Sequence, residues 1–400
     1  MAKKQKRFKR RGGSKSQLDQ RLSKTARELY QGLREEDLEF EEAWDDGGLG
    51  ASFGRASTPN RRSARSPRAS SSGQRDGLDE ADVGPTTEGT VYALASGIAW
   101  VQDDEGHRHE CALPTRLAAD QQSSIAVGDR VLWAPVATAH DASDSSSDDL
   151  RVVEVLPRRT FLGRPDPLNP RLQRVVAANV DIVVQVASVV RPPLRPALVD
   201  RYLIAIQQGH AEPVLCVNKA DLLDDSDDPE TSRAKAELQL ADYRALDLPL
   251  VWTSVKSGTG LDELRGLLEG KTAAFVGHSG VGKSSLINAL APEVDAATGA
   301  VSQSYGTGRH TTTRSDLYDL GDFRLIDTPG IREMGLWNLD PIALRDYFPE
   351  FEDAARSCRF RDCSHLHEPD CVVRRGVEDG DISRRRYETY LRILESLNEP

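Results

Sequence analysis

The sequence has no long apolar run. None of its hydrophobic stretches approaches the roughly 20 residues that a membrane-spanning helix needs, and its amino-terminal residues show no signal-peptide pattern. No stretch resembles the heptad repeat of a coiled coil. From the lack of apolar runs and of a signal peptide we expect a soluble, cytoplasmic protein that contacts no membrane. We also expect a monomer, although the sequence does not determine the oligomeric state.

Cysteine is scarce and unevenly placed. Five cysteines occur in 400 residues, and three of them, Cys358, Cys363 and Cys371, lie in one short window. In a cytoplasmic chain such a cluster is more often metal-binding than disulfide-bonded. Cys111 and Cys216 lie in apolar, strand-like runs, so we expect them to be small residues of the hydrophobic core.

Positive charge is in the minority, since the formal net charge is -11. This balance argues against nucleic-acid binding over the whole surface, but local basic stretches remain. The chain begins with MAKKQKRFKRRGGSK, continues with an acidic run from Arg34 to Asp46, and is rich in Ser and Arg from Arg55 onward. Residues 1–85 lack apolar periodicity, so we expect a disordered arm. Its basic start is either a solubilising tail or an electrostatic tether for RNA phosphates.

The remaining chain is too long for one compact core, so we expect several folded units. Residues 86–165 contain about five short strand-like runs and no helical pattern, which is typical of a small closed β-barrel such as the OB type. A barrel of this kind either contacts RNA or simply packs on its neighbour. Composition does not separate these two roles.

From residue 175 to 335, apolar strands alternate with helical patterns. NVDIVVQVAS predicts a buried strand, LRPALVDRYLIAIQQG predicts a helix, and the alternation continues to the hairpin-like pair SDLYDL and DFRLID. This pattern predicts a doubly wound α/β sheet with ligand loops at the carboxyl ends of its strands. Residues 336–400 are mostly helical and end in SRRRYETYLRILESL, a basic amphipathic helix that offers a local patch for RNA.

A phosphate-binding loop follows the predicted strand KTAAFVG. The sequence GHSGVGKSS matches GxxxxGK[ST], and a helical pattern follows it, as the motif requires. Its glycines let backbone N–H groups turn onto phosphates, Lys283 reaches the β- and γ-phosphates, and Ser284 offers a hydroxyl to Mg²⁺. The residues expected to contact the nucleotide here are Gly277, His278, Ser279, Gly280, Val281, Gly282, Lys283, Ser284 and Ser285.

A guanine-reading motif, NKAD, follows the apolar run EPVLCV. The carboxylate of Asp221 can accept hydrogen bonds from guanine N1–H and the exocyclic amine, which adenine does not present in that arrangement. Asn218, Lys219 and Ala220 complete the motif and support the ring. In the sequence TSVKSGTG, Ser254, Val255 and Lys256 are expected to close over the base edge, although an ordinary strand-to-helix turn would look similar.

Two further segments lie where the Mg²⁺-binding and γ-phosphate-sensing loops of GTP-binding proteins belong. DTPG fits the DxxG element, with Asp327 near Mg²⁺ and the Gly330 N–H available to the γ-phosphate. GRHTTT precedes it and contains a candidate Mg²⁺-binding threonine. We expect Thr312 in that role, and Thr311 and Thr313 remain alternatives.

The residue after DTPG is unusual. Many GTPases carry a glutamine there that orients the attacking water, whereas this chain has Ile331, which cannot hydrogen-bond a water. His310 of GRHTTT is the nearest substitute, because an imidazole can hold or polarise water. The alternative is that His310 contacts a partner or solvent.

The carboxyl-terminal cysteines form part of a candidate zinc site. Cys358, Cys363, His365 and Cys371 provide three thiolates and one imidazole, which suits a single structural, tetrahedral Zn²⁺ in a segment with little apolar core of its own. His367 is the competing nitrogen ligand, and free thiols are the alternative to a metal site.

The order of these motifs is as informative as their identity. NKAD precedes the phosphate loop, which is followed by GRHTTT, DTPG and the Cys-x4-Cys-x-His-x5-Cys cluster. From about Glu88 to Ser396 the chain therefore resembles the RsgA family of circularly permuted, small-ribosomal-subunit-dependent GTPases. The resemblance implies slow GTP hydrolysis that the small (30S) subunit stimulates during late maturation. It also implies that the barrel and the zinc unit bind ribosomal RNA.

Two other classes compete with this interpretation. A phosphate-loop ATPase or kinase would explain GHSGVGKSS but not NKAD. A nucleotide-gated RNA-binding assembly factor with little hydrolysis would explain every motif except a need for catalysis, and the absence of the glutamine keeps this alternative open. Because the permutation connects the DTPG loop directly to the zinc unit, a γ-phosphate-dependent shift could move that unit as a lever.

Overall fold

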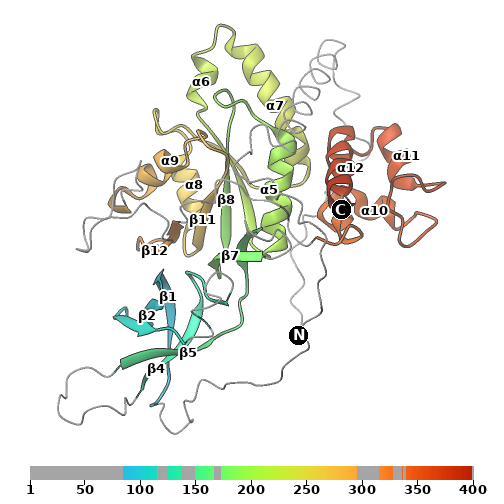
Figure 1. The fold of residues 1–400 in the computed structure, drawn as a ribbon. Coiled ribbons are helices and arrows are strands. Elements are labelled where there is room, and N and C mark those ends of the chain that lie inside the picture. Colours follow the sequence, from blue (N-terminus) through green and yellow to red (C-terminus); the bar gives the residue numbers. More distant parts are fainter. Residues whose placement is uncertain are drawn as a thin grey trace, which may run out of the picture.

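The computed structural model describes the chain over residues 84–114, 117, 124–136, 149–165, 173–294, 315–327, 336 and 339–398. Figure 1 shows a β-barrel at the bottom, an α/β unit above it and a helical unit beside the α/β unit. The arm expected at residues 1–85 lies outside the described part up to residue 83.

The barrel confirms the prediction of about five short strands. The described strands follow the order β1-β2-β3-β5-β4, and β4 pairs back with β1, which closes them into a barrel. A tight turn at Gly97, with φ of 77°, joins the first two strands. The strands are β1 (Thr87–Ala95), β2 (Ile98–Asp103), β3 (Arg108–Ala112), β4 (Arg130–Val136) and β5 (Asp149–Val155).

The α/β unit confirms the predicted alternation. Its strand order is β10-β9-β8-β11-β13-β12, parallel throughout except for the antiparallel pair β12–β13. A single bridge from Ala93 of β1 to Asp316 of β12 joins this sheet to the barrel. The strands are β8 (Ile182–Ser188), β9 (Glu212–Asn218), β10 (Leu250–Trp252), β11 (Thr272–Val276), β12 (Asp316–Asp319) and β13 (Arg324–Asp327).

Helices cover both faces of this sheet (Figure 1). All seven residues of β8 are buried, and its neighbouring side chains face opposite layers, since Val184 packs with α8 and α9 whereas Val183 packs with α5. The helical segments of the unit are α5 (Pro196–Gln208), α6 (Asp221–Asp224), α7 (Pro229–Ala245), α8 (Leu261–Leu268), α9 (Lys283–Leu290) and η2 (Pro292–Val294).

A hairpin that the sequence analysis missed lies between the barrel and the α/β unit. It consists of β6 (Phe161–Pro165) and β7 (Gln173–Ala178). The Phe161 N–H donates to Gly209 O at 2.9 Å, just beyond the end of α5. A barrel loop meets the same hairpin at Gly128, whose φ is 90° and where a Cβ would lie 2.1 Å from Ala178 O. This glycine permits the close backbone contact.

The carboxyl-terminal unit is mostly helical, as predicted. Phe348, Phe351 and Tyr390 form an aromatic core, and Ile204 of α5 packs into the same cluster. The unit is therefore seated on α5. Its helical segments are η3 (Ala343–Tyr347), η4 (Pro349–Phe351), α10 (Glu352–Ala355), α11 (Val372–Glu378) and α12 (Arg384–Asn398).

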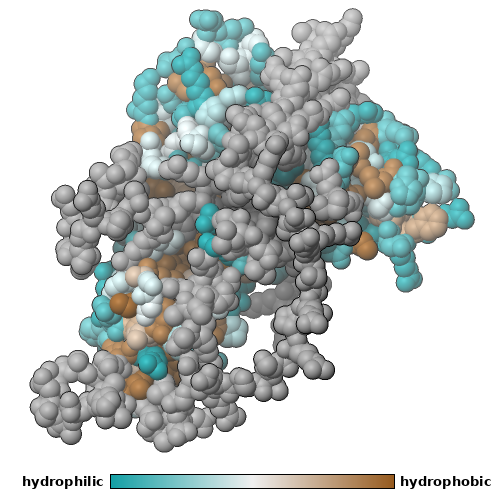
Figure 2. Space-filling view, in the orientation of Figure 1, coloured by the Kyte–Doolittle hydropathy of each residue, from teal (hydrophilic) through white to brown (hydrophobic). Residues whose placement is uncertain are grey.

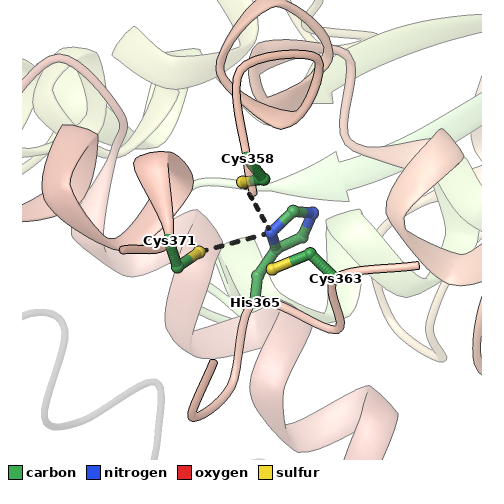
Figure 3. A group of neighbouring side chains, drawn as sticks. All are labelled: Cys358, Cys363, His365 and Cys371. Carbon is green, nitrogen blue, oxygen red and sulfur yellow. Dashed lines mark hydrogen bonds between the residues drawn. The ribbon is translucent and has the colours of Figure 1, made fainter. Parts of the chain in front are cut away.

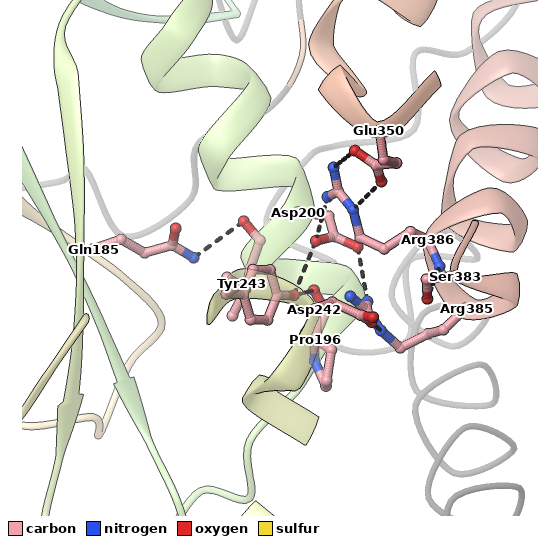
Figure 4. A network of polar contacts seen from close by, with 10 residues as sticks. Gln185, Pro196, Asp200, Asp242, Tyr243, Glu350, Ser383, Arg385 and Arg386 are labelled. Atoms are coloured by element: carbon pink, nitrogen blue, oxygen red, sulfur yellow. Dashed lines mark hydrogen bonds and ion pairs between the residues drawn. The ribbon is translucent and has the colours of Figure 1, made fainter. Parts of the chain in front are cut away.

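An ion network also fixes α12 to α5 and α7 (Figure 4). Arg385 and Arg386 each donate to the fully buried Asp200, and they also bond Asp242 and Glu350, respectively. Both arginines are 3% exposed. The expectation that the SRRRYETYLR stretch offers these side chains to RNA is therefore wrong for Arg385 and Arg386, because buried carboxylates already bind both guanidinium groups.

The surface visible in Figure 2 carries both polar and apolar residues. Figure 2 shows apolar and polar areas interspersed over the carboxyl-terminal unit, where Ile342, Phe360 and Leu366 are exposed. In the described part of the chain, no helix combines the length and apolarity needed to cross a membrane.

Candidate nucleotide site and metal centre

The phosphate loop lies between β11 and α9, as its motif predicts. Gly277 has φ of 140°, and a Cβ there would lie 2.2 Å from Val186 O of the neighbouring strand. Gly282, the residue before α9, has φ of 97°. Side chains at these two positions would block the tight path of the loop, so glycine is required at both. Ser284 and Ser285 are exposed in the first turn of α9.

Lys283 folds back over its own loop. Its Nζ donates to Gly277 O at 2.5 Å and to His278 O at 2.9 Å. Both acceptors are neutral carbonyls, so a phosphate oxygen would be a stronger partner for the ammonium group. The loop can therefore present one cation and the amino terminus of α9 to an anion.

NKAD lies directly against the phosphate loop although 55 or more residues separate them. Asn218 donates through Nδ2 to Val281 O at 2.9 Å, and the two residues are 63 positions apart in the sequence. Lys219, whose φ is 62°, donates from Nζ to Gly280 O at 2.5 Å. A Cβ on Gly282 would lie 2.4 Å from Asn218 Nδ2. The structure thus brings the two motifs into direct contact, in spite of their reversed order.

Asp221 is held in position by the segment that follows β10. Ser254, which is fully buried, donates from Oγ to Asp221 Oδ1 at 2.6 Å, and Lys256 Nζ lies 3.9 Å from Oδ2. Val255 is 36% exposed beside them, and Ala220 is buried. Hydrogen bonds that fix a carboxylate in advance of binding reduce the entropy lost when a ligand arrives.

Thr253 is a residue of this region that the sequence analysis missed. Its Oγ1 donates to Asn218 Oδ1 at 3.1 Å and contacts Cys216 Sγ at the same distance. Asn218 is thereby fixed at both ends of its amide. In the sequence, Thr253 is one residue of TSVKSG with nothing to distinguish it from an ordinary strand end. Cys216 and Cys111 are buried, as expected.

Asp327 ends β13 beside Asp316 of β12. Burial and the negative charge of Asp316 raise the pKa of Asp327. A cation at this position would relieve both effects, which suits a metal-binding carboxylate. The other predicted residues of the two switch-like segments, His310, Thr312 and Gly330, lie outside the described residues.

The four predicted zinc ligands gather at one point in the carboxyl-terminal unit (Figure 3). One donor atom from each of Cys358, Cys363, His365 and Cys371 lies within 4.8 Å of the others. The Nδ1 atom of His365 lies 3.4 Å from Cys371 Sγ and 3.8 Å from Cys358 Sγ. Tetrahedral Zn²⁺ with bonds of about 2.0–2.3 Å requires separations of roughly this size. His367 is exposed and outside the group.

The protonation of His365 also suits a metal. Burial, together with the Arg345 charge, lowers the pKa of His365 to about 4, so its imidazole is neutral near pH 7. A neutral imidazole is the form that binds Zn²⁺. Three thiols around a neutral ring, two of them buried, would otherwise form a weakly bonded cluster. The donor set therefore fits zinc.

Residues outside the cysteine pattern hold the loop that carries His365 in place. Glu368 accepts from Ser364 N and Oγ at 2.7 and 2.6 Å, and from the N–H groups of Leu366 and His367 at 3.2 and 3.3 Å. Tyr387 OH donates to His365 O at 2.7 Å. Neither Glu368 nor Tyr387 was predicted, because no ligand spacing marks them in the sequence.

Comparisons with known proteins agree with this geometry. The RsgA GTPase family model matches residues 155–337. A small ribosomal subunit biogenesis GTPase RsgA from Haemophilus influenzae (strain PittGG) is 39% identical over 319 residues, which cover 79% of this chain and 87% of the relative. RsgA 1 from Vibrio vulnificus (strain YJ016) is 40% identical over 80% of this chain and 87% of its own.

Two solved structures share the architecture. YjeQ from Thermotoga maritima has a TM-score of 0.61 and 32% identity, covering 79% of this chain and 100% of its own. YloQ, described as a circularly permuted GTPase, has a TM-score of 0.60 and 26% identity, covering 81% and 99% of the two chains. Strand order, motif contacts and similarity agree, so this chain belongs to the RsgA family of circularly permuted GTPases and is a GTP hydrolase.

Proposed function

We propose that this protein binds the small (30S) ribosomal subunit and its RNA, and that it hydrolyses GTP to GDP and phosphate in the late maturation of that subunit. The proposal extends to this chain what the names of its relatives state about them. It includes stimulation of hydrolysis by the subunit, action as a monomer and a cytoplasmic location, where such subunits are assembled.

The contact between NKAD and the phosphate loop is the observation that supports the nucleotide role best. Asn218 is bonded to both Val281 O and Thr253 Oγ1, while Ser254 orients Asp221. We infer that Asp221 reads the guanine edge and that Asn218, Lys219 and Ala220 support the base. Ser254 and Val255 would then border the base, with the phosphates directed toward residues 277–285.

The expected contacts with the phosphates follow from the charges of the residues in and near the phosphate loop. We infer that Lys283 exchanges its bonds to Gly277 O and His278 O for oxygens of the β- and γ-phosphates, and that backbone N–H groups of the glycine-rich loop complete the cradle. Ser284, Asp327 and Thr312 would hold Mg²⁺, which supplies neutralisation of phosphate charge when bound. The Gly330 N–H would meet the γ-phosphate.

His310 is the proposed catalytic residue. Ile331 cannot orient water, and an imidazole in the GRHTTT segment can do so. We expect His310→Ala to abolish hydrolysis and to leave the affinity for GTP nearly intact. Hydrolysis by His310→Ala at the wild-type rate would remove this assignment.

The flanking units complete the proposal. We assign residues 86–165 to the OB-type barrel, 175–335 to the GTPase domain and 336–400 to a helical domain with one structural Zn²⁺. Cys358, Cys363, His365 and Cys371 would hold the metal, since their donor atoms already converge. We infer that the barrel and the zinc domain provide the RNA-binding surfaces, and that residues 1–85 are an arm.

Single-turnover GTP hydrolysis, with and without purified small subunits, tests the proposed function. We expect the subunits to accelerate turnover, whereas large subunits should not. Subunit binding that depends on GTP without any acceleration would instead favour a nucleotide-gated assembly factor with little physiological hydrolysis. Absence of binding to small subunits in every nucleotide state would refute the proposal.

A further inference from the structure

The turn between the zinc-ligand candidates Cys358 and Cys363 carries an exposed aromatic ring. The four residues between them are RFRD, and Phe360 is 40% exposed. Within the described residues, Phe360 lies outside the aromatic core of the carboxyl-terminal unit. A single exposed apolar side chain is ordinary on a protein surface, so the surroundings of this ring decide whether it binds a partner.

The backbone of this turn is held from several sides. The Cys363 N–H donates to Phe360 O at 3.3 Å, which closes the turn. Arg345 Nη1 donates to Arg361 O at 3.0 Å and to Cys363 O at 3.2 Å. Cys358 and Cys363 also converge with the other two zinc-ligand candidates (Figure 3). The ring is therefore presented by a short, fixed turn, which reduces the entropy lost when a ligand binds.

An arginine stands on each side of the ring in the sequence. The guanidinium carbon of Arg359 lies 5.5 Å from the centroid of the Phe360 ring. The ion pair of Arg359 with Asp370 is long, at 3.9 Å, and both side chains are more than 60% exposed, so water screens it. Arg361 is exposed, and its guanidinium forms no ion pair within the described part of the chain. Both guanidinium groups are thus available to phosphate oxygens.

Negative charge also lies close to this turn. Asp362 follows Arg361 directly and is exposed, and a Zn²⁺ ion held by three thiolates and one neutral imidazole carries a net negative charge. Arg356, just before the turn, is already paired with Glu352 and Asp353. The turn is therefore not a broad basic face. It suits a ligand that combines a flat ring with few negative groups.

An unpaired RNA nucleotide has this combination. Its base presents a π-face that stacks on an aromatic side chain, and its phosphates accept hydrogen bonds from arginine. A base within a duplex is already stacked on its neighbours and does not meet a single ring in this way. A protein partner would need a contiguous surface, since a stable interface buries about 800 Å² on each side. One ring among charged residues does not provide this.

We propose that residues 359–362 form a binding site for an unpaired nucleotide of single-stranded RNA. The base stacks on Phe360, and Arg359 and Arg361 bind the adjoining phosphates. The inference rests on the proposed function, because it names the kind of RNA element that the zinc domain contacts. The exposed basic contact of this domain thus lies on the turn between two metal ligands rather than at the two arginines of α12 that are buried and paired.

A short, fluorescein-labelled oligouridylate is the probe, and fluorescence anisotropy measures its binding to the full-length, zinc-loaded protein. Phe360→Ala should weaken binding by roughly five- to a hundredfold, the effect of one stacked base. Phe360→Trp keeps a flat ring and should bind like the wild type, whereas Phe360→Leu keeps only apolar volume and should not. An RNA duplex of the same length should bind the wild type and Phe360→Ala equally.

The salt concentration separates stacking from electrostatic attraction. The basic amino-terminal stretch is present in every variant, and its attraction for phosphates falls steeply as salt rises. The affinities are therefore compared over a salt series that extends to high concentration, where the difference due to Phe360 persists. Arg361→Gln should lower the slope of log affinity against log salt by roughly 0.7, the loss of one phosphate contact on a single strand.

Ile342→Ala is the matched control. Ile342 is another exposed apolar residue of the same unit, at 59%, but it lies outside the turn and should leave oligouridylate binding unchanged. Zinc content and unfolding temperature should be equal in all these variants, because Phe360 and Ile342 lie outside the core. Ultraviolet cross-linking of oligouridylate to the wild type, followed by mass spectrometry, should place uridine on the fragment that carries Phe360.

Either of two results would overturn the proposal. One is equal affinity of Phe360→Leu and the wild type for oligouridylate at every salt concentration, which would assign the ring to apolar contact with a protein. The other is a cross-linked wild type without uridine on the fragment that carries Phe360. Binding of purified small subunits is measured in parallel. If the wild type binds them, either result removes this inference alone, whereas a wild type that does not bind them contradicts the proposed function.

Discussion

Arg386 Nη1 lies 2.8 Å from Asp200 Oδ1, and the two side chains are 4% and 0% exposed. Arg385 Nη1 bonds the second oxygen of the same carboxylate at 2.8 Å, and Tyr243 OH donates to Oδ1 at 2.9 Å. One carboxylate of α5 therefore holds two adjacent arginines of α12 (Figure 4). The carboxyl-terminal unit is bonded to the GTPase fold at its helix α5, in addition to the covalent connection after β13. Any lever motion of that unit must carry α5 along or break this network.

Asp200→Asn tests how much this network stabilises the fold. The substitution leaves the buried Arg385 and Arg386 without their shared counter-charge, and removal of one partner from a buried ion pair costs about 3–5 kcal/mol. We expect the free energy of unfolding of the α/β and carboxyl-terminal units, measured by urea titration, to fall by this amount. Asp224→Asn is the control, because its pair with Arg233 is exposed and is worth less than about 1 kcal/mol. Equal losses in both variants would contradict the argument.

The same carboxylate predicts a dependence of stability on pH. Burial opposes ionisation of Asp200, but Arg385 and Arg386 outweigh it and hold its pKa below the usual value. A depressed folded-state pKa means that the stabilisation is complete above the unfolded-state pKa, about 3.9, and is lost as the pH falls through the folded-state value. The stability difference between wild type and Asp200→Asn should be constant from pH 5 to 7, roughly, and shrink below about pH 3.9. A difference that grows on acidification would refute this sign.

Gly282→Ala should separate nucleotide binding from folding. The new Cβ would lie 2.4 Å from Asn218 Nδ2, so either the phosphate loop or NKAD must shift and the Asn218 bond to Val281 O is lost. We expect GTP affinity to fall by roughly tenfold or more, from about 1–2 kcal/mol of lost bonding and left-handed strain. Titration with a fluorescent GTP analogue measures the loss of affinity.

Gly321→Ala is the matched control for that experiment. Gly321 has a similar φ of 85°, but a Cβ there would meet no atom of the described residues within 4 Å. It therefore carries the same left-handed strain at the turn between β12 and β13 without a clash. Gly321→Ala should lower stability slightly and leave GTP affinity unchanged. If both variants bind GTP equally well, the contact between the two loops does not determine affinity.

Ser254→Ala tests the orientation of the guanine-reading carboxylate. Loss of the 2.6 Å bond from Ser254 Oγ frees Asp221 to rotate, and one such bond to a charged acceptor is worth about 1.5–3 kcal/mol. We expect GDP affinity to fall by roughly tenfold and the preference for guanine over adenine to narrow, both measured by nucleotide competition. Ser257→Ala is the control, since its hydroxyl contacts Thr259 rather than Asp221. A fall in affinity with unchanged base preference would assign Ser254 to folding alone.

Local patterns account for what the sequence could predict. The run NVDIVVQVAS contains no charge after Asp181, and the corresponding strand β8 is buried along its whole length. The positive φ angles of Gly277 and Gly282, 140° and 97°, are similarly local properties of the phosphate loop that its motif predicts. Burial periodicity and backbone conformation are properties of short windows, so a single sequence carries them.

The features that escaped prediction depend on partners far away in the chain. Arg385 bonds Asp200 across 185 residues, and nothing in SRRRYETYLR marks two of its arginines as buried. The β6–β7 hairpin is short, and its position depends on a contact with Gly209 at the end of α5. Pairings of this kind follow from the tertiary fold, and a basic stretch was therefore mistaken for a free surface.

Glu368→Gln should weaken the zinc site although Glu368 is not a ligand. Burial opposes ionisation of Glu368, but hydrogen bonds from Ser364 and its neighbours lower its pKa to about 2, so the carboxylate is charged and holds the loop that carries His365. A neutral amide is a weaker acceptor for these N–H groups, and loss of such support commonly lowers metal affinity 10- to 100-fold, roughly. Competition with a colorimetric zinc chelator measures this, with Asp353→Asn as control, because Asp353 is 90% exposed and pairs with Arg356. Equal zinc retention by Glu368→Gln and wild type would mean that the four ligands hold the loop without help.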